Sequence, residues 1–141
     1  MKRKASAQWT GSLKEGKGTV STGSGLLQDA PYSFGTRFEE GKGTNPEELV
    51  GAAHAGCFSM ALSAQLTNAG TPPERINTTA TVTFEKTEPG FTVTSIHLDV
   101  AGKVPGTTQQ AFEKAAENAK AGCPISRLLN TEITMTAWLE S

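Results

Sequence analysis

The sequence predicts an α+β fold, because segments with the alternating pattern of strands are interleaved with segments of helical character. The clearest strand signal is a long hairpin. Ile76 to Lys86 and Phe91 to Val104 both alternate apolar and polar residues, and Glu88-Pro89-Gly90 forms the turn between them. The clearest helix signal is the segment between Glu48 and Gln65, which has sixteen residues and no Asp, Glu, Lys or Arg.

The N-terminal part predicts an antiparallel meander. Residues 4–9 and 18–22 have short strand patterns, and glycine-rich turns follow at 16–18 and 22–25. A further strand is expected over Tyr32 to Phe38, followed by the turn 41–44.

A strong helix start follows that turn. Asn45 is a suitable N-cap, Pro46 suits the first helical position, and Glu48 stands three residues after the cap, where a capping box places Glu. Gly70 and the two prolines after it end the helix.

A helix that is apolar on all sides needs cover on all sides. One small α+β chain can hardly supply it, so we expect a dimer in which the partner covers part of the helix. A membrane span is disfavoured, since sixteen residues that include His54 and Ser59 are too few and too polar.

The C-terminal part predicts a second helix and a closing strand. The helix has an apolar stripe, ends at Gly122, and is followed by one or two further turns over 125–130. The stripe residues are Phe112, Ala115, Ala116 and Ala119, and the strand residues are Ile133, Met135, Ala137 and Leu139. We expect a single domain over residues 1–141.

Composition limits the possible functions. The chain has 141 residues, a net charge of −1 and 36% hydrophobic residues, which fits a globular protein and predicts neither a nucleic-acid partner nor a membrane partner. Its two cysteines are too few for a disulfide scaffold and make no CxxC motif. The basic start Met1 to Lys4 lacks a following apolar segment, so we expect a cytoplasmic location with reduced thiols.

Two other kinds of site are disfavoured. Gly11 to Lys17 begins like a phosphate-binding loop, but Gly18 replaces the hydroxyl residue and a strand is expected to follow. His54 and His97 have no third ligand at metal spacing, so we expect no metal and no cofactor. His54 is best interpreted as a packed core histidine, with tuning of a nearby thiol as the alternative.

Cys57 is the candidate nucleophile, although a lone cysteine is usually buried and inert. Glu47 and Glu48 open its helix. Glu47 is roughly 80° from Cys57 around the helix axis and about 15 Å away along it, whereas Glu48 faces the opposite side. Glu47 can therefore affect the Cys57 thiol only through an intermediary, such as a long cationic side chain.

Arg37 is the candidate cation, although an arginine at this position is often only solvated. Burial raises a thiol pKa and suppresses the reactive thiolate, and a guanidinium reverses that effect. A carboxylate can hold the guanidinium by two hydrogen bonds. Cys57, Arg37 and Glu47 thus form a consistent set of nucleophile, activator and orienting group.

Cys123 is a buried small residue, an incidental surface thiol or, as the only other cysteine, the internal partner that resolves an oxidised Cys57.

With these residues considered, the chain resembles the OsmC/Ohr family, the osmotically inducible and organic hydroperoxide resistance proteins, and more closely its OsmC branch. The resemblance extends over nearly the whole chain. Its most specific motifs are Thr36-Arg37-Phe38, NPEEL at 45–49, AAHAGCFSMAL at 52–62 and AGCP at 121–124.

The resemblance implies an OsmC-like fold, in which antiparallel sheets wrap around a central cysteine-bearing helix in an intertwined homodimer with active sites at the subunit interface. It also implies a thiol-dependent peroxidase. Cys57 would be the peroxidatic cysteine, Cys123 the resolving cysteine, Arg37 the activating arginine and Glu47 the residue that holds it. An external dithiol, with lipoyl-bearing proteins as candidates, would recycle the enzyme.

In the expected mechanism, Cys57 is oxidised by a hydroperoxide to a sulfenic acid, and Cys123 then condenses with it to a disulfide. An apolar wall of Phe34, Phe38, Phe58 and Met60 would favour organic hydroperoxides over hydrogen peroxide. Two alternatives stay open: a non-catalytic dimeric binding module that holds an apolar ligand near Cys57, and a protein in which both cysteines are core residues.

Overall fold

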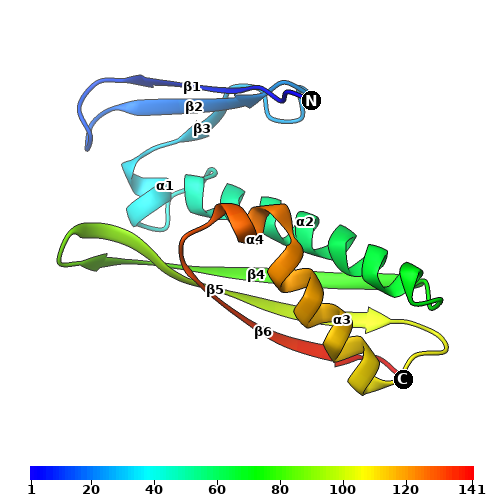
Figure 1. The fold of residues 1–141 in the computed structure, drawn as a ribbon. Helices are drawn as coiled ribbons and strands as arrows, with labels where there is room; N and C mark the ends of the chain where they lie inside the picture. Colours follow the sequence, from blue (N-terminus) through cyan, green and yellow to red (C-terminus); the bar gives the residue numbers. More distant parts are fainter. The chain divides into compact units, whose positions relative to one another are not determined.

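The computed structural model describes all residues 1–141 and confirms the α+β class (Figure 1). The chain divides into two compact units, Met1–Leu49 and Val50–Ser141. The expectation of a single domain stays a prediction.

The N-terminal unit contains a small antiparallel sheet in the order β1-β2-β3. Its strands are β1 (Ala5–Thr10), β2 (Lys17–Thr22) and β3 (Ala30–Tyr32). The predicted meander is therefore confirmed, and its first two strands lie within a residue of the expected positions.

The expected strand over Tyr32 to Phe38 is wrong, because the chain forms a short helix there, α1 (Phe34–Phe38). A capping box starts this helix: the Ser33 side chain accepts a hydrogen bond from the Thr36 N–H, and the Thr36 Oγ1 accepts one from the Ser33 N–H. Phe34 and Phe38 stand four residues apart, and their ring centroids lie 4.8 Å apart. That helical spacing was the signal in the sequence that favoured a helix.

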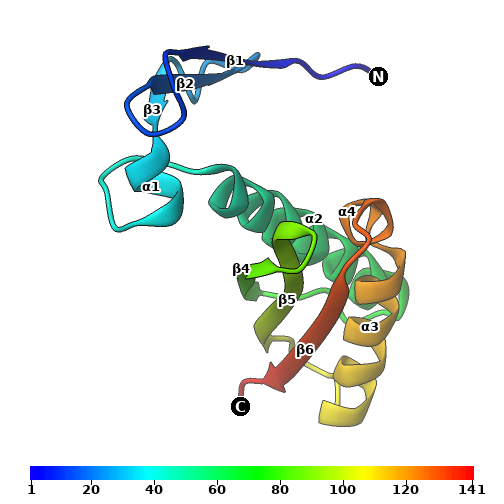
Figure 2. The same ribbon diagram turned by 90° about the vertical axis from the view of Figure 1, so that its left-hand side faces the viewer.

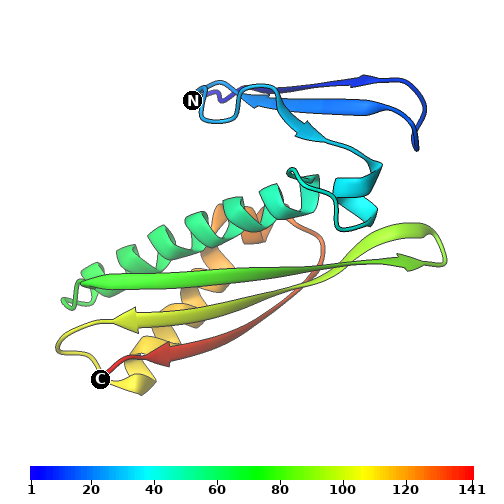
Figure 3. The same ribbon diagram turned by 180° about the vertical axis from the view of Figure 1, so that it is seen from behind.

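The C-terminal unit has two layers, a three-stranded sheet and helices on one of its faces (Figures 1 and 3). The strands β4 and β5 form the predicted hairpin, and β6 pairs with β5 in parallel, so this sheet is mixed. The elements are α2 (Pro46–Asn68), β4 (Arg75–Thr87), β5 (Gly90–Lys103), α3 (Gln109–Gly122), α4 (Pro124–Leu128) and β6 (Glu132–Leu139).

Helix α2 begins where the sequence indicates, and both long helices end close to the predicted positions. Asn45 Oδ1 accepts a 2.7 Å hydrogen bond from the Glu48 N–H at the start of α2, although the Glu48 carboxylate accepts from the Thr44 hydroxyl instead of closing a capping box. At the start of α3, Thr108 accepts from the Ala111 N–H, and Cys123 is the C-cap residue.

The core of the C-terminal unit lies between the helices and the sheet. It contains Phe58, Leu62 and Leu66 from α2, Ile96, Leu98 and Val100 from β5, and Phe112, Ala115, Ala116 and Ala119 from α3. Two glycines permit this close packing. A Cβ at Gly51 would meet the Val82 side chain at 3.2 Å, and one at Gly102 would meet the Phe112 ring at 2.5 Å.

Helix α2 is buried along one face only. Its buried residues follow the helical repeat, whereas Met60 on another face is 78% exposed. The buried residues are Gly51, His54, Phe58, Leu62 and Leu66. The chain therefore covers one side of the helix, and the cover expected from a second copy remains a prediction.

At 23 residues, α2 is longer than its charge-free stretch. By length and composition it is the one helix of the chain that could cross a membrane. The expectation that the helix is too short for a span is therefore wrong. Its buried stripe packs on the sheet as the stripe of a core helix does.

Candidate functional site

The two cysteines are in contact. Cys57 lies on α2 and Cys123 at the junction of α3 and α4, and their Sγ atoms are 2.9 Å apart as free thiols. Figures 1 and 2 show the reason, since α4 turns back from the end of α3 and lies beside α2. Cys123 is fully buried, whereas Cys57 is only partly buried and retains access to solvent.

Local interactions make Cys57 the weaker acid of the pair. Burial raises the pKa of the Cys57 thiol, and the hydrogen bond with Cys123 raises it further. The N–H of Ile125 acts in the opposite direction but does not offset these effects. A reactive thiolate at Cys57 therefore needs an additional positive charge.

Cys123 is the stronger acid. Burial alone would raise its pKa, but interactions with Cys57, with the N–H groups of Ser126 and Ile125 and with the Ser126 side chain lower the Cys123 pKa below its usual value. These surroundings favour a thiolate at Cys123 more than at Cys57.

A buried polar pair adjoins Cys123. His54 Nε2 lies 2.7 Å from Ser126 Oγ, and the two residues are 0% and 9% exposed. Burial lowers the pKa of His54, so this ring is neutral near pH 7. The prediction of a packed, hydrogen-bonded core histidine is confirmed.

The N-terminal unit contains a second polar pair. The Arg37 Nη2 and Nε atoms donate to Glu47 Oε1 at 2.8 and 3.1 Å, so the carboxylate is held by two nitrogens of the guanidinium. The Glu47 side chain is 11% exposed and that of Arg37 38% exposed. The carboxylate is thus largely withdrawn from water, while the guanidinium retains access to a ligand.

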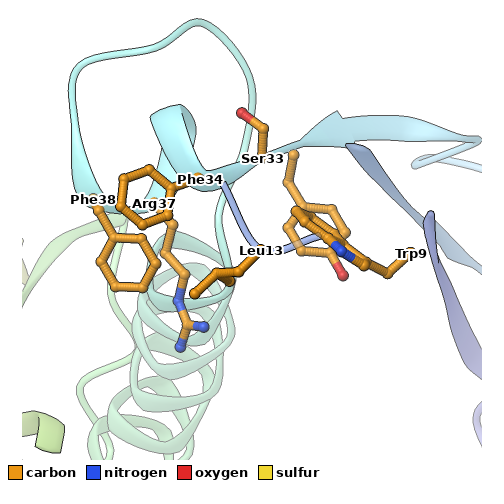
Figure 4. A pocket seen from close by; sticks show the side chains of 7 residues that line it. Trp9, Leu13, Ser33, Phe34, Arg37 and Phe38 are labelled. Carbon is orange, nitrogen blue, oxygen red and sulfur yellow. The ribbon is translucent and has the colours of Figure 1, made fainter. Parts of the chain in front are cut away.

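An apolar pocket of about 240 Å³ adjoins this arginine. Figure 4 shows Arg37, Phe34 and Phe38 extending from α1 on one side and Trp9 from β1 on the other, with Leu13 between them in this view. The Arg37 guanidinium also lies 5.3 Å from the centroid of the Phe38 ring. The lining residues are Trp9, Leu13, Tyr32, Ser33, Phe34, Arg37 and Phe38.

The four candidate residues thus form two pairs, Cys57 with Cys123 and Arg37 with Glu47, in different units of the chain. Phe58 was expected in a substrate wall together with Phe34 and Phe38, but it is 0% exposed in the core and cannot line such a wall. Ser126 was not anticipated. No sequence signal links it to His54, because the two residues are 72 positions apart.

Comparison with known proteins supports a peroxidase. The OsmC-like protein family matches residues 39–137. "Peroxiredoxin OsmC" of Escherichia coli (strain K12) is 53% identical over 139 residues, which cover 99% of this chain and 97% of that protein.

Solved structures agree with the fold. The organic hydroperoxide resistance protein OhrB of Bacillus subtilis superposes with a TM-score of 0.70 at 20% identity, covering 97% of this chain and 98% of that one. An organic hydroperoxide resistance protein OsmC from Legionella pneumophila gives a TM-score of 0.68 at 25% identity, covering 98% and 97%. The chain therefore belongs to the OsmC/Ohr family, in its OsmC branch, and is a cysteine-based peroxidase.

Proposed function

We propose that this peroxidase reduces organic hydroperoxides through Cys57 and resolves the product with Cys123. The observation that supports this cycle is the 2.9 Å approach of the two sulfur atoms, which a disulfide can bridge with little rearrangement. A binding module of the same fold would not require that approach.

In the first step, the Cys57 thiolate attacks one oxygen of the hydroperoxide. The O–O bond breaks, the sulfur becomes a sulfenic acid, and the alkoxide takes up a proton and leaves as the alcohol. In the second step, the Cys123 sulfur attacks the sulfenic sulfur, and the hydroxyl group leaves as water with one added proton.

Arg37 has the role of activating Cys57 in this proposal. The pKa of Cys57 is raised by its own surroundings, and a permanent positive charge favours the thiolate. Glu47 orients the guanidinium through two hydrogen bonds, and the Arg37 side chain is 38% exposed.

The substrate preference follows from the aromatic pocket beside Arg37. Its volume of about 240 Å³ and its lining by Trp9, Phe34 and Phe38 suit an alkyl or aryl group, which hydrogen peroxide lacks. Hydrogen peroxide would be the weaker substrate.

An external dithiol completes the cycle by thiol–disulfide exchange, and lipoyl groups on proteins have the required chemistry. The enzyme acts as a homodimer in the cytoplasm, where the thiols stay reduced between turnovers. The exposed apolar face of α2 supports the dimer, since Met60 on that face is 78% exposed.

The test is mass spectrometry of the reduced protein after one equivalent of an organic hydroperoxide. We expect a rapid loss of about two mass units, located on a linked pair of peptides that contain Cys57 and Cys123. An unchanged mass and two free thiols would refute the peroxidase cycle and favour the binding module or plain core cysteines.

A further inference from the structure

The second step needs a Cys123 nucleophile in a fully buried position. Burial penalises a thiolate, which is the form that attacks the sulfenic sulfur. In the reduced protein the Cys123 thiol donates a hydrogen bond to Cys57, and once Cys57 is oxidised it has no thiol hydrogen to share with Cys123. Other groups must then stabilise the charge of the attacking sulfur.

Ser126 is placed to do so. Cys123 is the N-cap residue of α4 and Ser126 is the third residue of that helix, and a side-chain hydrogen bond from Ser126 is among the interactions that lower the Cys123 pKa. Ser126 is 9% exposed, so its hydroxyl group must satisfy its hydrogen bonds within the protein.

His54 determines which way that hydroxyl group donates. Its Nδ1 atom is buried with no hydrogen-bond partner, while Nε2 lies 2.7 Å from Ser126 Oγ. A proton on Nδ1 would bury an unpaired N–H, which is costly and rare. We therefore assign the proton to Nε2, and the ring then donates to Ser126 Oγ. The Ser126 hydroxyl then accepts from His54, so its own hydrogen can point at the Cys123 sulfur.

We propose that His54 and Ser126 are positioning residues for the disulfide-forming step, in which the neutral imidazole orients the serine hydroxyl to stabilise the Cys123 thiolate. This inference rests on the peroxidase cycle proposed above. The step itself stays balanced: Cys123 loses its thiol proton, the S–S bond forms, the S–O bond of the sulfenic acid breaks, and the hydroxide leaves as water after taking up a proton.

Few other charges face this sulfur. From α2 the titratable groups are Cys57 and His54. On α3 the Lys120 ammonium pairs with Glu117, Arg127 of α4 is exposed, and the sheet residues that pack here are apolar. The acidity of Cys123 should therefore respond measurably to the loss of one hydrogen bond.

The first experiment follows the Cys57 sulfenic acid by rapid mixing and trapping in the parent and in Ser126→Ala. The variant should still consume its first equivalent of peroxide, because Cys57 and Arg37 are unchanged. Its sulfenic acid should persist about tenfold longer, as expected for losing one hydrogen bond to a charged sulfur. The rate of disulfide formation should also reach its maximum at a higher pH in the variant than in the parent.

Two further variants separate orientation from packing. His54→Leu should behave like Ser126→Ala, and His54→Gln, which retains an N–H donor, should recover part of the rate. Ser59→Ala is the matched control, since Ser59 is also a partly buried hydroxyl residue of this unit but bonds to Ala55 and Thr78. It should leave the lifetime of the sulfenic acid unchanged.

The second experiment does not depend on peroxide. In a Cys57→Ser background, the ultraviolet absorbance of the thiolate titrates Cys123 directly, and adding Ser126→Ala should raise the Cys123 pKa by about one unit. An unchanged Cys123 pKa would overturn the inference, as would an unchanged sulfenic-acid lifetime. If the parent itself forms no sulfenic acid, the peroxidase cycle fails, and this titration still decides the role of Ser126.

Discussion

The sulfur atoms of Cys57 and Cys123 lie 2.9 Å apart, although the two cysteines are 66 residues apart in the chain. The contact is made by α2 and by the junction of α3 and α4, which pack on the same face of one sheet. The two thiols nevertheless have different environments, because Cys57 is partly exposed and Cys123 is fully buried.

The two cysteines should therefore give unequal variants. Cys57→Ser should abolish peroxide consumption, because no other thiol has access to the substrate. Cys123→Ser should consume about one equivalent and stop as a sulfenic acid, since the first step needs only the Cys57 thiolate. A coupled peroxide assay with a trap for sulfenic acid measures both. Equal turnover by both variants would exclude these assignments.

The Arg37–Glu47 pair should control the reactivity of Cys57. Glu47→Gln leaves the guanidinium without its charged partner, so the second-order rate constant with peroxide should fall about tenfold or more, in keeping with the strength of a charge-assisted pair. Arg37→Lys should also lower it, because an ammonium group cannot make the two-nitrogen contact.

Glu48→Gln is the matched control, since the Glu48 carboxylate binds the Thr44 hydroxyl group and not Arg37. It should retain nearly the parental rate constant. If Glu47→Gln and Glu48→Gln reacted alike, the pair would have no special role in the chemistry.

The aromatic pocket should determine substrate preference. Leu13→Ser places a hydroxyl group in the pocket lining, so kcat/KM for cumene hydroperoxide should fall severalfold while kcat/KM for hydrogen peroxide stays the same. Leu26→Ser, at a residue that is 88% exposed and outside the lining, provides the control. A parallel loss with both peroxides in Leu13→Ser would assign the pocket another role.

Buried His54 should make stability depend on pH. Burial lowers its pKa in the folded protein, so the unfolded chain binds a proton that the folded chain does not. The free energy of unfolding should decrease as pH falls below about 6.5, the pKa of an unperturbed histidine. Urea denaturation at several pH values measures this, and His54→Gln should flatten the slope. The same slope in parent and variant would attribute the effect to another group.

The exposed face of α2 should carry the contact between two subunits. Met60→Glu would bury a charge in that contact, so light scattering after gel filtration should show a smaller species than the parent. Leu26→Glu makes the same change at an exposed loop position and should keep the parental size. A parent protein that is itself monomeric would disprove the dimer.

The sequence by itself determined most of the local structure. Asn45 caps α2 as expected, Gly122 ends α3, and the alternation of β4 and β5 places Ile96, Leu98 and Val100 in the core. These features depend on neighbouring residues and on a regular repeat, which can be interpreted without the fold. The prediction failed at α1, where the Ser33–Thr36 capping box competed with a strand-like pattern.

The tertiary structure decided what the distant residues do. The pairing of Ser126 with His54, the contact of the two sulfurs and the difference in acidity between them depend on how α2, α3 and α4 pack. It also decided which face of α2 is covered, so that Phe58 lies in the core while Met60 is exposed. Residue type fixes which groups can react, but burial and hydrogen-bond partners set their acidity, and both arise only from the folded chain.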